Sequence, residues 1–331
     1  MKDKLSHRER IEAIMRGETP DRPAISLWRH FYHLESTAKG LAEAMLEYQK
    51  KYDWDFMKIN PRASYHVEDW GNKLEWSVRE FDKHRKVKFA IESVEDWDKI
   101  EILSLTAPVL AEHLNAIRLI RKGSGKELPL LMTVFTPLSI AGDLVAREKM
   151  LLEHLAQDPK RVIRALENIT VTFEHYVKEI RNAGADGIFL ATTEWATSEM
   201  MSYSQYAEYA RPLDLRILNA TGSNALNLLH VCRGSNYLKE LSDYPVQLVN
   251  WDASDPTNLP IDKGAEFLKN MIAVGGIDQT GWLWYATPGE IAEEMSKIKG
   301  RMAGRRFIFG PGCTYDPQVP DKNIRAVRAA V

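Results

Sequence analysis

The sequence predicts a (β/α)8 barrel formed by a single domain over residues 1–331. Eight short apolar runs alternate with longer helical patterns, which is the order of elements in such a barrel. The runs are continuously apolar, as expected for parallel strands covered on both faces. An open, doubly wound sheet is the alternative, but it requires a glycine-rich phosphate loop after the first strand. The sequence there is Arg29-His30-Phe31-Tyr32-His33, without glycine.

The chain opens with a predicted helix, and strands and helices then follow in turn. Ser6 and Glu9 form a capping-box pattern at the start of this helix, and Gly17 ends it. The predicted strands are 24–28, 56–59, 128–135, 187–191, 225–231, 246–251, 271–274 and 307–309. The predicted helices between them are 43–51, 109–121, 159–182, 203–218, 237–242 and 261–269, and a last long helix begins at the Thr287 cap.

The longest departure from this alternation is the segment 61–127. Within it, residues 74–78 and 87–91 flank a charged tip at 82–86, which predicts a β-hairpin inserted after the second strand. Loops at the C-terminal ends of the strands surround the site in barrel enzymes. We therefore expect this hairpin to form a lid over the barrel mouth.

The composition argues against several classes of partner. The 44 basic and 46 acidic residues give a formal net charge of −2, which offers no reason to expect nucleic acid or an anionic membrane surface. No apolar stretch approaches the length of a membrane span, and the N-terminus is charged rather than apolar. Two cysteines do not make a disulfide framework. We expect a cytoplasmic protein whose two thiols stay reduced.

The two cysteines and one histidine form the strongest candidate site. His230 and Cys232 lie two positions apart at the end of the fifth strand, so their side chains point the same way. Cys313 follows the eighth strand in a Gly-Pro-Gly-Cys turn. One imidazole and two thiolates are ligands that zinc prefers, and three protein ligands leave a position open for chemistry. The alternative is two unrelated buried cysteines, since free cysteine behaves as a small hydrophobe.

Further candidates follow the ends of other strands, where barrel enzymes carry their chemistry. The candidate catalytic residues are Glu194, Asp252 and Asp278. Glu194 is also a candidate fourth zinc ligand, and either aspartate is a candidate partner that orients His230. For all three, the alternatives are solvated loop positions or helix N-caps.

The candidate substrate-binding residues are Arg29, His30, Asn60 and Trp251. Arg29 either binds an anionic group of the substrate or pairs with an acidic residue on a loop. Trp251 either lines the pocket or belongs to the hydrophobic core, as aromatic residues more often do.

Together with these residues, the chain resembles the uroporphyrinogen decarboxylase superfamily, most closely its zinc-dependent, corrinoid-linked methyltransferases. The resemblance covers nearly the whole chain and is carried by the segments 16–23, 68–71, 183–186, 229–232, 310–313 and 323–327. That branch is marked by an H-x-C…C zinc signature, which His230, Cys232 and Cys313 match residue by residue. The resemblance implies an enzyme that moves a methyl group between a corrinoid, carried by a partner protein, and a small thiol, ether or amine.

Two other hypotheses stay open beside this one. The decarboxylases carry an R-Q-A-G-R-Y motif near strand one, of which only Arg29 remains, and an aspartate near the end of strand two, where this chain has the neutral Asn60. They also use no metal, so the histidine and both cysteines would have no purpose. A non-catalytic scaffold stabilised by zinc is the third hypothesis, but structural zinc sites usually have four protein ligands.

Overall fold

Eight parallel strands form one curved sheet in the computed structural model, which describes residues 4–331. In the order in which they lie side by side, the strands are β1 (Ala24–Ile25), β10 (Phe307–Pro311), β9 (Ile272–Ile277), β8 (Leu248–Trp251), β7 (Leu228–Val231), β6 (Gly187–Ala191), β5 (Leu130–Phe135) and β2 (Met57–Ile59). Every neighbouring pair in this sheet is parallel. All eight predicted strands are therefore present.

The two end strands, β1 and β2, meet and close the barrel. The backbone N–H of Asp55 donates to the Ile25 carbonyl at 2.9 Å, and the Ser26 hydroxyl donates to the Phe56 carbonyl at 2.7 Å. The Asp55 carboxylate also accepts the Ile25 N–H at 2.8 Å. Side-chain and backbone bonds thus join the short strands at this seam. The predicted (β/α)8 barrel is confirmed.

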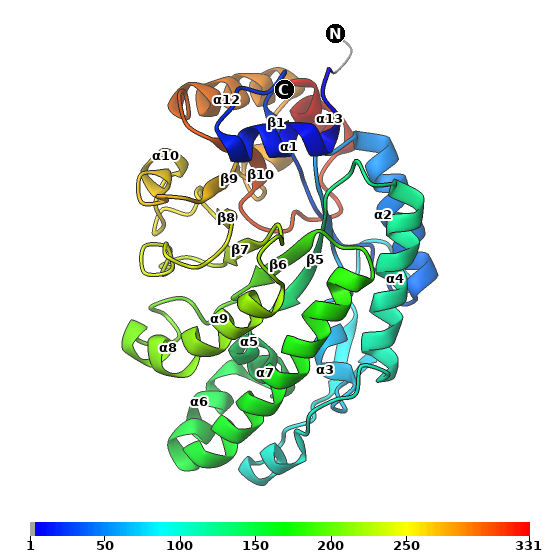
Figure 1. The fold of residues 1–331 in the computed structure, drawn as a ribbon, viewed down its shortest axis with the longest axis vertical. Helices are drawn as coiled ribbons and strands as arrows, with labels where there is room; N and C mark the ends of the chain where they lie inside the picture. Colours follow the sequence, from blue (N-terminus) through cyan, green and yellow to red (C-terminus); the bar gives the residue numbers. More distant parts are fainter. Residues whose placement is uncertain (1–3) are drawn as a thin grey trace.

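Helices surround the barrel on its outside (Figure 1). They are α1 (His7–Arg16), α2 (Ala38–Tyr52), α3 (Tyr65–Glu68), α4 (Pro108–Ser124), α5 (Pro137–Leu144), α6 (Glu148–Gln157), α7 (Pro159–Asn182), α8 (Tyr203–Tyr209), α9 (Arg211–Ala220), α10 (Ile261–Ala265), α11 (Trp282–Tyr285), α12 (Pro288–Arg301) and α13 (Asp321–Ala329), with a 3-10 helix at Val94–Lys99. Ser6 and Glu9 form the predicted capping box of α1, and Gly17 ends that helix with φ +79°. No helix of residues 4–331 combines the length and the apolar character needed to cross a bilayer.

Two helix predictions were wrong. The segment 203–218 is two helices rather than one, because Pro212 has no backbone N–H to continue the ladder and sits at the start of α9. Residues 237–242 form turns, with a single helix-like bond from the Leu241 N–H to the Tyr237 carbonyl. Pro245 follows closely, so this turn cannot extend into a helix.

The barrel interior is a small apolar cluster that supports the site from below. Its members come from all eight strands or the residues beside them, and include Phe56, Leu131, Leu228, Leu248 and Ile308. Ile11 and Ile14 of α1 belong to the same cluster and cover its N-terminal end. Because strand side chains alternate with period two, the layer above Leu228 and Leu248 contains His230 and Asn250.

The predicted hairpin after β2 is confirmed, but its strands are shorter than expected and the second one begins at Arg85, inside the predicted charged tip. It consists of the antiparallel strands β3 (Lys73–Glu75) and β4 (Arg85–Lys88). We call residues 73–88 the hairpin from here on.

Candidate metal centre

His230, Cys232 and Cys313 meet at the C-terminal end of the barrel. His230 is in β7, Cys232 follows this strand directly, and Cys313 lies two residues beyond β10. Among residues 4–331, these three form the one group of histidine, cysteine and acidic side chains whose ligand atoms all lie within 4.8 Å of one another. The closed barrel is what brings the ends of β7 and β10 together.

The distances from Cys313 Sγ to the other two ligand atoms fit a tetrahedral zinc ion. The two Sγ atoms are 3.8 Å apart, and Cys313 Sγ is 3.6 Å from His230 Nε2. Zinc bonds of about 2.3 Å to sulfur and about 2.0–2.1 Å to nitrogen, at tetrahedral angles, place two sulfurs about 3.8 Å apart and a sulfur and a nitrogen about 3.6 Å apart. The donor set and its spacing therefore both suit zinc.

Asn250 fixes which nitrogen of His230 faces the site. The Asn250 amide nitrogen donates to the carbonyls of Val274 and Pro311 at 2.7 and 2.9 Å. Its oxygen must then face His230 Nδ1, which is 2.6 Å away. An amide oxygen only accepts, so Nδ1 carries the proton and the Nε2 lone pair points toward the cysteines. Such a partner orients a metal-ligating histidine.

A second hydrogen-bond chain holds the turn that carries Cys313. The Gly312 N–H donates to the Gln279 side-chain oxygen at 2.8 Å, and the Gln279 amide donates to the Asp252 carboxylate at 2.7 Å. A Cβ on Gly312 would lie 2.7 Å from the Asp252 Cα, so only glycine allows this close approach. Asp252 thus contacts the Cys313 turn through Gln279, whereas Asn250 contacts His230.

Without a metal ion, the pKa values of the two thiols are shifted in opposite directions. The Cys232 S–H beside it lowers the pKa of the Cys313 thiol. The pKa of Cys232 rises because a second thiolate would face the first one in a buried place. A divalent cation between them removes this conflict and keeps both as thiolates.

Two adjoining cavities open at the metal centre. Both cysteines line an inner cavity of about 260 Å³ and an outer cavity of about 880 Å³. The inner one reaches down to Lys58 and Phe189, and the outer one extends to His84 in the hairpin. The centre is therefore accessible to a small molecule from the barrel mouth.

The predicted polar residues do not all reach these cavities. His30 lines both, with its Nδ1 3.2 Å from the buried Glu35 carboxylate. Asn60 lines the inner cavity and accepts a hydrogen bond from Lys58. Glu194 lines the outer cavity, where burial raises the pKa of its carboxyl group. Its roles as catalytic residue and fourth ligand stay predictions.

Three of the candidates have other partners. Arg29 donates to Glu80 of the hairpin at 2.9 Å, which is the second of its two predicted alternatives. Asp278 lines neither cavity, and its carboxylate accepts the Gly281 N–H at 2.7 Å before α11, as a loop cap does. Neither Asp278 nor Asp252 contacts the His230 ring, so the predicted orienting role belongs to Asn250 instead.

Trp251 belongs to the core and not to the pocket, so its predicted place in the site was wrong. It is fully buried, packs closely on Gly264 of α10, and donates its indole N–H to the Leu259 carbonyl at 2.8 Å. Alternation along β8 turns Trp251 outward and Asn250 inward.

Sequence reasoning missed four residues around the centre: Glu35, Lys58, Asn250 and Gln279. Of these four, Lys58 is the easiest to predict from the sequence, because a lysine interrupts the apolar run of the second strand. Burial lowers the pKa of Lys58 to about 7, against the opposing effect of negative charge on Cys313, Cys232 and Glu35. The other three carry no signal of their own.

The hairpin contacts the residues around the cavities. Its Lys86 pairs with Asp143, and both residues line the inner cavity; His84 Nε2 lies 3.5 Å from the Glu35 carboxylate. Four large apolar side chains of the hairpin are nevertheless exposed to solvent: Trp76, Val78, Phe81 and Val87. A few polar contacts rather than a packed core therefore hold it in place.

We expect the hairpin to be protected when a ligand fills the cavities. Local opening breaks its contacts to Asp143 and Glu35, and a ligand that binds only the closed state makes this opening rarer. Hydrogen exchange of residues 73–88, with and without a small thiol on the zinc-loaded protein, measures this. Helix α12, on the outer wall, is the internal control. Equal exchange of the hairpin in both states would argue against a lid.

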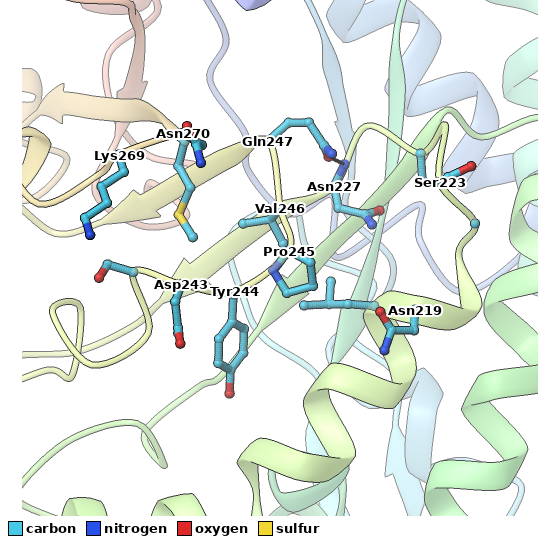
Figure 2. Close-up of a pocket in the computed structure, with 15 residues that line it drawn as sticks. Asn219, Ser223, Asn227, Asp243, Tyr244, Pro245, Val246, Gln247, Lys269 and Asn270 are labelled. Carbon is cyan, nitrogen blue, oxygen red and sulfur yellow. Dashed lines mark hydrogen bonds between the residues drawn. The ribbon is translucent and has the colours of Figure 1, made fainter.

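A further pocket, of about 790 Å³, lies at the other end of the strands (Figure 2). Its residues precede β7, β8 and β9, and include Asn227, Gln247 and Asn270. In Figure 2 the Gln247 side chain accepts the Asn227 N–H, at 2.8 Å. This pocket has a mixed polar and apolar lining and contains no group of metal ligands, so it does not compete with the candidate metal centre as a site for chemistry.

Comparison with known proteins identifies one matching family model and several related proteins. A family model described as uroporphyrinogen decarboxylase matches residues 6–331. The methylcobamide:CoM methyltransferase MtbA of Methanosarcina acetivorans is 25% identical over 249 residues, covering 72% of this chain and 68% of that protein. A uroporphyrinogen decarboxylase of a Geobacter species is 26% identical over 221 residues, covering 62% of this chain and 60% of its own length.

The fold matches a solved structure over its whole length. A methyltransferase from Methanosarcina mazei superposes with a TM-score of 0.84 and 19% identity, covering 99% of this chain and 98% of that one. A B12-independent methionine synthase from a Shewanella species follows with a TM-score of 0.57 and 13% identity, covering 93% and 94%. At these identities the matches concern the fold.

Proposed function

The chain belongs to the uroporphyrinogen decarboxylase family, and on this basis we propose that it is a zinc-dependent methyltransferase. It moves a methyl group between a corrinoid, carried by a partner protein, and a small thiol, ether or amine. The observation that carries the proposal is the group of His230, Cys232 and Cys313, whose spacing suits one tetrahedral zinc ion. The methylcobamide:CoM methyltransferases among the relatives support the same chemistry.

The residues of the chain have distinct tasks in this proposal. His230, Cys232 and Cys313 hold the zinc ion, which supplies Lewis acidity to a sulfur or oxygen atom of the substrate. Asn250 keeps the His230 lone pair directed at the site, and Gln279 holds the Cys313 turn. The hairpin restricts access of water from the mouth. Glu194 and Asp252, which line the outer cavity, are proposed to contact the substrate.

The partner protein docks at the barrel mouth in this proposal. The methyl group must reach the metal centre, and the outer cavity opens at that end of the strands. Thiolate ligands also require a reducing compartment, so we propose a cytoplasmic location. These two statements depend on the zinc chemistry and are proposed with it.

Uroporphyrinogen decarboxylation is the second candidate, because decarboxylases are among the relatives. Two contacts weigh against it. At the end of β2 the neutral Asn60 accepts from Lys58, instead of presenting a free carboxylate to pyrrole N–H groups. Arg29, the remaining residue of the decarboxylase motif, is paired with Glu80. Decarboxylation would also give no role to the three candidate metal ligands.

The test is an assay of both reactions on the same preparation. We expect the zinc-loaded protein to demethylate methylcobalamin in the presence of small thiols, seen as a change in the cobalt spectrum, and the chelator-treated protein to lose this activity. Uroporphyrinogen is offered in parallel, with release of carbon dioxide as the readout. Decarboxylation that survives removal of zinc would overturn the proposal in favour of the second candidate.

A further inference from the structure

Lys58 is a buried lysine inside the barrel, and it lines the same inner cavity as both cysteines. It is the middle residue of β2, its side chain points inward, and 5% of the residue is exposed. One of its three N–H groups bonds to the Asn60 oxygen. Its ammonium group also lies 4.6 Å from the centre of the Phe189 ring and 5.9 Å from that of Trp28.

No carboxylate of residues 4–331 forms an ion pair with Lys58. Lysine is almost never fully buried without a paired charge, because an ammonium group loses its hydration in an apolar place. Aromatic faces and one amide oxygen replace only part of that hydration. An ammonium that is buried and incompletely paired, with donors facing a cavity, indicates a negative charge that arrives with a ligand.

The charges of the metal ion and its three protein ligands indicate that the negative charge would be carried by the fourth ligand. A divalent ion held by two thiolates and a neutral imidazole has no net charge. With a neutral ligand in the fourth position, no negative charge of the centre balances a Lys58 ammonium group, and the lowered pKa of about 7 lets the buried lysine release its proton. An anionic fourth ligand gives the centre one negative charge, which Lys58 balances at short range in a medium of low dielectric constant.

We propose that Lys58 is a specificity-determining residue that makes the metal centre select an anionic fourth ligand, in the form of a small thiolate, over neutral ethers and amines. This inference rests on the proposed function and narrows its substrate class to thiols. Lys58 acts through its charge and does not coordinate the metal.

Lys86 is a matched comparison in the same cavity. It also lines the inner cavity, but its ammonium group is paired with Asp143. Its charge is already balanced inside the protein, so replacing it alters the field at the metal centre less. If replacing Lys58 has a larger effect than replacing Lys86, the effect therefore comes from an unbalanced charge and not merely from a lysine near the site.

The test measures ligand selectivity on the cobalt-substituted protein, whose visible absorption reports the fourth ligand directly. We titrate it with 2-mercaptoethanol, which binds as a thiolate, and with dimethyl sulfide, which binds as a neutral ligand. In Lys58→Met the affinity for the thiol is expected to fall about tenfold or more, because an opposite charge at short range favours the charged form by at least that factor. The affinity for the sulfide is expected to stay within about twofold, and Lys86→Met keeps the ratio of the two affinities.

The outcomes separate this inference from the proposed function. An unchanged ratio in Lys58→Met overturns the role of Lys58 and leaves the methyltransferase proposal standing. A wild-type protein that binds no metal overturns both, before any variant is made. Methionine matches the lysine stem in size and removes a buried charge, so the variant is expected to fold. If it does not fold, Lys58→Gln removes the charge and keeps a polar group. The ratio of its affinities for the thiol and the sulfide then tests the role of Lys58 in the same way.

Discussion

Replacing Cys232 or Cys313 by serine is expected to lower the zinc content from about one ion per chain to less than about a tenth of that, while the barrel stays folded. A hydroxyl group does not ionise at neutral pH and is a poor zinc ligand. Removing either cysteine leaves two protein ligands, which hold the ion weakly. The fold does not depend on the metal, because the apolar cores inside and outside the barrel pack without it.

Elemental analysis of anaerobically purified protein measures the zinc content, and circular dichroism with thermal melts measures folding. Glu194→Gln is the matched comparison, since Glu194 lines the outer cavity but is not one of the three residues whose ligand atoms meet. It is expected to keep the zinc. Loss of zinc in Glu194→Gln would establish Glu194 as a ligand. Global unfolding of both serine variants would instead support the hypothesis of a structural zinc scaffold.

The sequence predicts the fold well because the barrel repeats one local pattern eight times. Each continuous apolar run is a strand in the structure, and β6 and α7 have the predicted bounds. Strand ends then locate the candidate metal ligands, since Cys232 and Cys313 both follow a strand on the same edge of the sheet. Elements without a strong pattern were missed, such as α5, which is short and buried on nearly all sides.

The residues that contact the candidate metal ligands were harder to predict. Two aspartates were proposed as partners of His230, because a carboxylate is a common partner of a metal-bound histidine. The actual partner depends on register: β7 and β8 pair His230 with Asn250, and Asp252 lies two residues beyond that pair. Register is a long-range property, so it cannot be read from one strand alone.

The same alternation explains why Trp251 was wrongly placed in the site and why Lys58 was missed. Trp251 is adjacent in sequence to the inward-facing Asn250, so it must face outward into the helix layer. Lys58 lies between two outward residues of β2 and must face inward, although its charge suggests the surface. Whether these side chains point into or out of the barrel depends on their position in the alternating pattern of the strand, and not on residue type.

Asn250 is the residue on which the geometry of His230 depends. It accepts from Nδ1 and donates to two carbonyls, so it joins β7, β9 and β10 below the metal centre. In Asn250→Leu the ring loses its partner and both nitrogens become equally available to carry the proton. The Val274 and Pro311 carbonyls lose the amide donor that Asn250 supplies, and each lost hydrogen bond costs about 0.5–1.5 kcal/mol of stability.

We therefore expect Asn250→Leu to weaken zinc binding by about 10- to 100-fold, the usual effect of removing the partner of a metal-ligating histidine. Competition with a chromophoric chelator measures this affinity. Asn227→Leu is the control, because Asn227 is an equally buried amide whose nitrogen donates to Thr221, at the other end of the barrel. It is expected to lower stability similarly and to leave zinc affinity unchanged. Equal zinc affinity in Asn250→Leu and the wild type would mean that packing against Phe189, 5.3 Å from the His230 ring, orients the histidine instead.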